Sequence, residues 1–134
     1  MAPPKINIAL IDDDQDEKYI FQIALDELEI DYSFDYFSSA NDFLDHINNS
    51  SVSLPNIAFL DMHMPLTSGL ELLEIIRKQS QFDSMRSVIY SNSMSEVTIS
   101  AFKSLGTVDF IVKPPELSEM KNVLRRLIIT DSLV

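Results

Sequence analysis

Several polar side chains with chemical potential each follow a short apolar run, at the point where a buried strand would end. They are Asp12, Asp13, Asp14, Asp61, Ser91 and Lys113. Clustered carboxylates repel one another unless a cation lies among them, and carboxylate oxygens with carbonyl groups and water suit the hard, octahedral ion Mg²⁺. With such an ion in place, a carboxylate oxygen can attack phosphorus to form an acyl phosphate, while a lysine and a hydroxyl neutralise the phosphoryl oxygens. The spacing predicts phosphoryl chemistry on Asp61.

The apolar patterns around these residues predict five strands that alternate with helices. Each strand is a short, mostly apolar run, and a segment with helical periodicity follows it. Runs of this kind with helical crossovers indicate a parallel sheet that is covered on both faces. The sequence therefore predicts an α/β protein of the (βα)₅ type. The expected strands are Ile6–Ile11, Tyr32–Phe37, Ile57–Leu60, Val88–Tyr90 and Phe110–Val112.

The expected helices are defined by apolar residues at helical spacing. Asp14 is expected to cap the first helix, because acids favour a helix N-terminus. Ser93, with Glu96 three residues later, predicts a capping box for the fourth helix. The predicted apolar stripe of the first helix is Ile20, Ile23, Ala24 and Leu28. Those of the later helices are Ala40, Phe43, Leu44 and Ile47; Leu72, Leu73, Ile75 and Ile76; Val97, Ala101 and Leu105; and Leu117, Met120, Val123, Leu124, Leu127 and Ile128.

This arrangement would gather the polar residues at one edge of the sheet. In open α/β sheets, ligands bind at the carboxyl ends of the strands, where the winding reverses. If the first and third strands are neighbours there, Asp12, Asp13 and Asp61 converge. Ser91 and Lys113 then arrive from the fourth and fifth strands. Each residue alone has a simpler explanation as a cap or a solvated charge, but the shared location favours a functional site.

Four segments resemble the signature segments of the response-regulator receiver domain, in the family's order and at compatible spacing. The resemblance spans Ile8 to Pro114 and, with the last helix, covers nearly the whole chain. The segments are Ile8–Asp14, Leu60–Pro65 with Gly69 eight residues after Asp61, Val88–Ser91 and Phe110–Pro114. The resemblance implies a flavodoxin-like, doubly wound sheet of five parallel strands in the order 2-1-3-4-5. It also implies a single receiver domain over residues 1–134, with its core at about 5–129, like a chemotaxis-type two-component regulator.

The resemblance also assigns roles to the residues at the expected sheet edge. Asp61 matches the phospho-accepting aspartate of the family. Asp12 and Asp13 match the acidic pair that holds Mg²⁺, and the other expected ligands are Asp61 and the backbone carbonyl of His63. Lys113 matches the lysine that pairs with the carboxylate or the phosphoryl group.

Further positions match the family's switch and tuning residues. Ser91 matches the switch hydroxyl and Phe110 the switch aromatic. His63 and Ser93, each two residues after a key position, match the places that tune the lifetime of the phosphoryl group. The Lys113–Pro114 peptide bond is expected to be cis, as an X-Pro bond can be at modest cost.

The composition excludes several other classes of protein. The chain has 134 residues, 10 Lys and Arg against 21 Asp and Glu, a net charge of −11 and no Cys. The lack of Cys excludes a disulfide scaffold, a thiol nucleophile and thiolate zinc sites. The acidic surplus argues against binding to nucleic acid or to an anionic membrane. No signal peptide and no run of roughly 20 apolar residues is present, so a cytoplasmic protein is expected.

The resemblance implies a stand-alone receiver in two-component signalling. A histidine kinase or histidine phosphotransfer protein would donate the phosphoryl group, and a switched surface would bind a downstream protein target. About twenty residues follow Lys113, so no effector domain is expected. The chain is expected to be a signalling phospho-acceptor that assists its own phosphorylation and dephosphorylation, and not an enzyme. Two alternatives stay open: an interaction module that is never phosphorylated, and an aspartyl-nucleophile phosphatase, which is disfavoured because His63 stands where a second acid is required.

Overall fold

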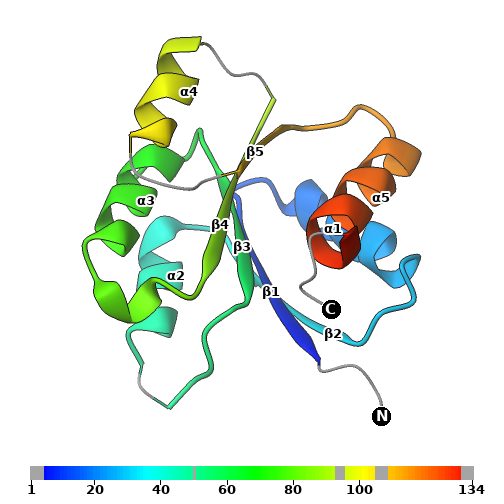
Figure 1. The fold of residues 1–134 in the computed structure, drawn as a ribbon, viewed down its shortest axis with the longest axis horizontal. Helices are drawn as coiled ribbons and strands as arrows, with labels where there is room; N and C mark the ends of the chain where they lie inside the picture. Colours follow the sequence, from blue (N-terminus) through cyan, green and yellow to red (C-terminus); the bar gives the residue numbers. More distant parts are fainter. Residues whose placement is uncertain (1–4, 50, 93–95, 105–108, 131–134) are drawn as a thin grey trace.

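Five parallel strands form one sheet in the computed structural model, which describes residues 5–49, 51–92, 96–104 and 109–130. The order is β2-β1-β3-β4-β5 (Figure 1), and each of the four pairings is parallel. This is the predicted flavodoxin-like, doubly wound α/β fold, which is confirmed. The strands are β1 Ile6–Ile11, β2 Tyr32–Phe37, β3 Ile57–Asp61, β4 Arg86–Ser91 and β5 Asp109–Val112.

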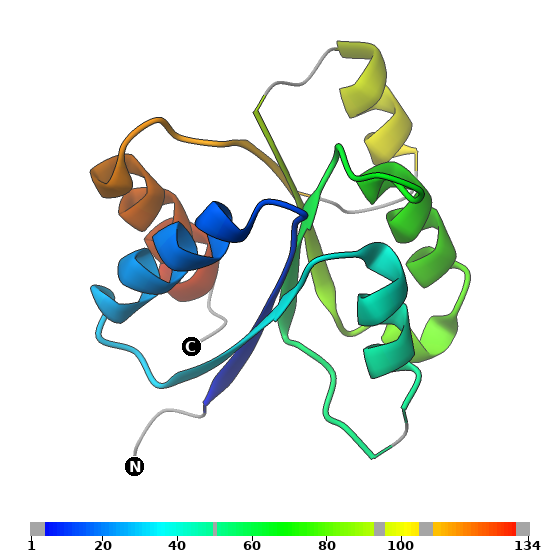
Figure 2. The ribbon, with the colours of Figure 1, turned by 180° about the vertical axis from the view of Figure 1, so that it is seen from behind.

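Helices cover both faces of the sheet, as right-handed crossovers between parallel strands require. Helices α1 and α5 lie side by side on one face, and α2, α3 and α4 lie on the other (Figures 1 and 2). A short 3₁₀ turn, η1 at Ser80–Phe82, precedes β4, and α5 continues into the π-helical turn η2 at Arg126–Thr130. The helices are α1 Gln15–Asp26, α2 Ala40–Ile47, α3 Gly69–Arg77, α4 Glu96–Lys103 and α5 Leu117–Arg125. No helix in the described ranges has the length and apolar character to cross a bilayer.

The core is divided into two layers by the alternation of side chains along each strand. In β1, Ile8 and Leu10 face α1 and α5, whereas Ala9 and Ile11 face α2 and α3. Every residue of β3 is buried, as expected for a central strand that is covered on both faces. Because both core layers pack against the strands, the positions at which the strands end are fixed as well.

The buried face of α1 differs from the predicted stripe. Ile20 and Ile23 are 38% and 51% exposed. The helix turns instead to place Phe21 in the core, where its ring packs edge-on against Phe59 at 4.9 Å and Tyr90 at 5.1 Å. Aromatic pairs at this separation add about 0.5–1.5 kcal/mol beyond the area they bury. The buried residues therefore follow the spacing i, i+3, i+4, i+7, at Phe21, Ala24, Leu25 and Leu28.

Strands β4 and β5 both begin earlier than predicted. Charged residues open them: Arg86 begins β4 and Asp109 begins β5. The Nε atom of Arg86 donates to Asp109 Oδ2 at 2.8 Å, and Nη1 donates to the Leu127 carbonyl at 2.9 Å. An apolar pattern misses these residues because they extend the strands through an ion pair. The predicted cap residue Ser93 lies outside the described residues.

Candidate functional site

The carboxyl ends of β1 and β3 bring three acids together. These strands are direct neighbours, with Ile11 opposite Leu60, so Asp12 and Asp61 follow at the same level. Carboxylate oxygens of Asp12, Asp13 and Asp61 lie within 4.8 Å of one another. The structure thus unites the acids that the sequence analysis expected to converge.

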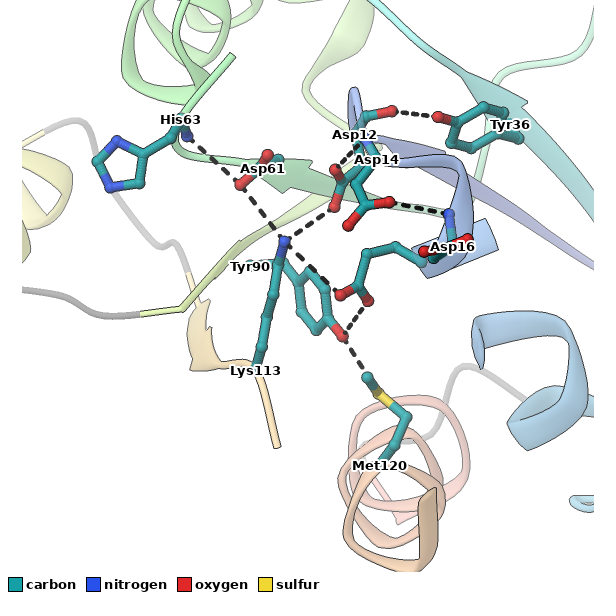
Figure 3. A network of polar contacts seen from close by, with 10 residues as sticks. Asp12, Asp14, Asp16, Tyr36, Asp61, His63, Tyr90, Lys113 and Met120 are labelled. Carbon is teal, nitrogen blue, oxygen red and sulfur yellow. Dashed lines mark hydrogen bonds and ion pairs between the residues drawn. The ribbon is translucent and has the colours of Figure 1, made fainter. Parts of the chain in front are cut away.

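The loop after β1 orients its three acids differently. Asp12 is buried, and its Oδ1 accepts the backbone N–H of Asp14 at 2.9 Å. The Tyr36 hydroxyl on β2 donates to the Asp12 carbonyl (Figure 3), which ties the loop to the sheet. Asp14 caps α1 as predicted, because its Oδ1 accepts the backbone N–H of Asp16 at 3.0 Å. Asp13 is exposed.

The loop after β3 presses closely on the backbone of Asp61. Gly69, the first residue of α3, donates its N–H to the Met62 carbonyl at 3.2 Å. A Cβ atom at position 69 would lie 2.4 Å from the Asp61 carbonyl oxygen. Only glycine fits there without displacing the acid, which gives a physical reason for the glycine of the motif. His63 donates its backbone N–H to Asp61 Oδ1 at 3.3 Å, and its ring points away from the cluster (Figure 3).

Lys113 brings a positive charge to the acids from the end of β5. Its backbone N–H donates to the Ser91 carbonyl at 2.7 Å, which anchors the residue beside β4. Its Nζ donates to Asp12 Oδ2 at 3.0 Å and lies 3.7 Å from Asp61 Oδ1 (Figure 3). The prediction of a cis Lys113–Pro114 bond is wrong: no peptide bond within the described ranges is cis, so this bond is trans. The trans form is the more stable for X-Pro, and the lysine reaches the acids from it.

The electrostatics of the cluster show a deficit of positive charge. Burial, followed by the charge of Asp12, raises the pKa of Asp61 to about 7, although Lys113 and the His63 N–H oppose the shift. Burial disfavours the ammonium of Lys113, but the hydrogen bond and charge of Asp12, with Asp61, outweigh burial and raise its pKa. One ammonium does not balance these carboxylates. A hard divalent cation would, and three convergent carboxylate groups are the donors that Mg²⁺ binds.

The two expected switch residues lie on neighbouring strands. Ser91 is buried at the end of β4, one residue beyond Tyr90, which is paired with Asp61. Phe110 in β5 is partly buried and packs against the core layer beneath α2 and α3. The structure thus places Ser91 at the carboxyl edge with the acids and Phe110 one strand further along.

Two residues at the site were not anticipated from the sequence. The hydroxyl of Tyr90 donates to Glu17 Oε2 at 3.0 Å, and Lys113 Nζ lies 5.0 Å from the centre of the Tyr90 ring. Burial raises the pKa of Glu17, against the opposing effect of Lys113 and the Tyr90 hydrogen bond. The sequence analysis placed Tyr90 at the end of the fourth strand and gave Glu17 no role. The available signal was a tyrosine, with a polar hydroxyl, directly before the strand-end Ser91.

Comparison with known proteins identifies related sequences. The sequence model of the response regulator receiver domain matches residues 8–125. The probable C4-dicarboxylate response regulator DctR of Bacillus subtilis is 33% identical over 72 residues, which are 54% of this chain and 31% of that protein. An uncharacterised response regulatory protein of Yersinia pestis is 24% identical over 122 residues, or 91% of this chain and 48% of that protein. The chain thus spans less than half the length of these relatives.

Solved structures share the fold. The phosphorylated cyanobacterial phytochrome response regulator RcpA matches with a TM-score of 0.85 at 20% identity, over 95% of this chain and 96% of that chain. The Mn²⁺-bound form of response regulator Rcp1 matches with a TM-score of 0.83 at 18% identity, over 96% of each chain. At such identities the similarity shows the architecture.

Proposed function

The chain belongs to the response regulator receiver domain family of two-component signalling, and from this premise we propose that Asp61 is its phospho-acceptor. The observation that carries this proposal is the geometry around Asp61. A buried carboxylate lies beside two further acids and 3.7 Å from the ammonium of Lys113. Burying unbalanced carboxylates is costly, and strongly perturbed acids of this kind mark functional sites.

A magnesium ion is the cofactor that this donor set fits. Asp12, Asp13, Asp61 and the backbone carbonyl of His63 are the residues that would hold it. When bound, the ion would neutralise part of the charge on the transferring phosphoryl group. Asp13 is exposed, so solvent reaches this donor of the set.

The protein's own residues would perform the transfer as follows. An oxygen of ionised Asp61 attacks the phosphorus of a phosphohistidine, the P–N bond breaks, and the leaving imidazole nitrogen keeps the electron pair of that bond. Lys113 and the Ser91 hydroxyl pair with the phosphoryl oxygens as charge moves onto them. The donor is a histidine kinase or a histidine phosphotransfer protein. Water would later hydrolyse the acyl phosphate, and His63 and Ser93, of which Ser93 lies outside the described residues, are proposed to tune its lifetime.

The phosphoryl group would act as a switch. It adds about −1.5 to −2 units of charge, by analogy with phosphoserine, at a site that is already short of positive charge. Ser91 would move toward it and Phe110 would shift, which biases the surface of α4, β5 and α5 between two states. A coupling of about 1–3 kcal/mol would change the affinity for a downstream protein several-fold to a hundred-fold.

The test is phosphorylation by a small donor. The purified protein is incubated with acetyl phosphate and Mg²⁺, and its intact mass is measured. We expect one phosphoryl adduct on the wild type and none on Asp61→Asn. An undiminished adduct on that variant, or none on the wild type, would refute the proposal. Rapid turnover of many phosphate esters would instead support the phosphatase alternative.

A further inference from the structure

The ammonium of Lys113 has a third anionic neighbour that lies outside the acid cluster. Besides Asp12 and Asp61, Oε1 of Glu17 lies 4.0 Å from Nζ. Asp12 and Asp61 belong to the carboxylates that could share one cation, and Glu17 does not. A cation bound by the cluster would neutralise part of the charge of Asp12 and Asp61, but not that of Glu17. Glu17 would therefore keep its full attraction to the Lys113 ammonium.

Glu17 is held in this orientation by a buried phenol. It lies in the first turn of α1, and its Oε2 accepts the Tyr90 hydroxyl at 3.0 Å. This bond leaves Oε1 facing the ammonium. The Tyr90 ring is buried in β4 against Phe21, and its hydroxyl also lies 3.8 Å from the Sδ of Met120 on α5 (Figure 3). Because the ring cannot turn away, the carboxylate is fixed as well.

We propose that Glu17, fixed by the Tyr90 hydroxyl, is a positioning residue that keeps the Lys113 ammonium beside Asp61. The proposal rests on the proposed function, in which Asp12 and Asp61 are shared with a cation and a phosphoryl group. A lysine ammonium is a point charge on a flexible four-carbon stem, and it loses side-chain entropy when it is ordered. Glu17 stabilises the ordered position through its own contact with Nζ, and the Tyr90 ring lies 5.0 Å from the same atom.

The first test compares rates of phosphorylation by acetyl phosphate at saturating Mg²⁺. Glu17→Gln keeps the shape and removes the charge, and it is expected to slow phosphorylation about five-fold, the effect of a partly buried ion pair. Tyr90→Phe retains the packed ring and should slow it about two-fold. The double variant should match Glu17→Gln alone, because the hydroxyl acts through the carboxylate. Additive effects, or a rate that is unchanged or faster in Glu17→Gln, would overturn the proposal.

A matched control removes the same charge from the same helical turn. Asp16 is exposed, and its backbone N–H is capped by Asp14. Asp16→Asn should leave the rate of phosphorylation undiminished. A decrease equal to that of Glu17→Gln would mean that net charge alone controls the rate, which would also overturn the proposal.

A second readout does not depend on phosphorylation. The Cε signal of Lys113 is followed by NMR with ¹³C-labelled lysine during a titration with Mg²⁺, and Lys113→Arg identifies the signal. In the wild type the signal should stay distinct from those of solvated lysines, and in Glu17→Gln it should move toward them. Equal behaviour of the two proteins would contradict the proposal. If the wild type takes up no phosphoryl group, the proposed function fails, and this signal still decides the role of Glu17.

Discussion

Two ion-pair clusters lie at opposite ends of the same sheet, and they differ in what the cation of each one contacts. At the amino ends of β4 and β5, Arg86 pairs with Asp109 and also donates to the backbone carbonyl of Leu127. At the carboxyl ends, the single ammonium of Lys113 is shared by Asp12, Asp61 and Glu17. The contacts of Arg86 join β4, β5 and η2, and so they contribute to structure. The cluster at the carboxyl ends is unmatched, because one ammonium serves three acids. Its remaining negative charge can bind a metal ion or take part in a switch.

The largest expected difference between the two clusters concerns catalysis. Lys113→Ala should lower the rate of phosphorylation by acetyl phosphate about 10²–10³-fold, the usual effect of removing one group that stabilises transition-state charge. Arg86→Ala, the matched control at the other end of the sheet, should leave that rate within about two-fold and lower the free energy of unfolding by about 1–2 kcal/mol. Equal rates in the two variants would remove the distinction between the clusters.

A second prediction concerns the close packing behind Asp61. Gly69→Ala places a methyl group 2.4 Å from the Asp61 carbonyl oxygen, so the β3–α3 loop must shift. Overpacking of this kind costs about 1–3 kcal/mol, and a displacement of the nucleophile should slow phosphorylation at least ten-fold. Ser68→Ala, which removes the neighbouring cap of α3, should cost about 1 kcal/mol without a comparable loss of rate. Chemical denaturation and intact mass measure the two effects.

A third prediction uses the raised pKa of Asp61, about 7 against 3.8. Between these values the folded protein retains a proton that the unfolded chain releases, so the free energy of unfolding should fall as the pH rises from about 4 to 7. Asp61→Asn removes this decrease. Without Mg²⁺ the variant should be more stable than the wild type by about 2–4 kcal/mol at pH 8, and the difference should vanish near pH 4. A wild type that is the more stable at pH 8 would contradict the deficit of positive charge.

The smallest expected effect tests the orientation of α1. Ile23→Gln changes a side chain that is 51% exposed, so the free energy of unfolding should change by less than about 0.5 kcal/mol. Phe21→Ala, two residues earlier, should lower the free energy of unfolding by about 3–5 kcal/mol, because it leaves a cavity in the core. A large loss of unfolding free energy in Ile23→Gln would instead indicate that the stripe predicted from the sequence is the buried face of α1.

The strand order was implied by the resemblance to the receiver-domain family. With the first and third strands as neighbours, the convergence of Asp12, Asp13 and Asp61 could be predicted, because parallel strands end at one edge. The face of α1 could not, since two overlapping stripes share Ala24 and Leu28, and the choice depends on Phe21 meeting Phe59 and Tyr90.

The contact between Tyr90 and Glu17 could not be predicted from the sequence either. It joins residues 73 positions apart, and neither residue carries a local pattern that indicates the other. The isomer of the Lys113–Pro114 bond also depends on tertiary context, because the local preference between cis and trans is small.

The central claim is that the unmatched cluster accepts a phosphoryl group on one specified carboxylate. Borohydride reduces an aspartyl phosphate to homoserine, so treatment after phosphorylation with acetyl phosphate and Mg²⁺, followed by peptide mass mapping, locates the modified residue. We predict homoserine at position 61 and at no other acid. Homoserine at Asp12 or Asp13, or its absence from position 61 in a protein that carries the phosphoryl adduct, would contradict the account.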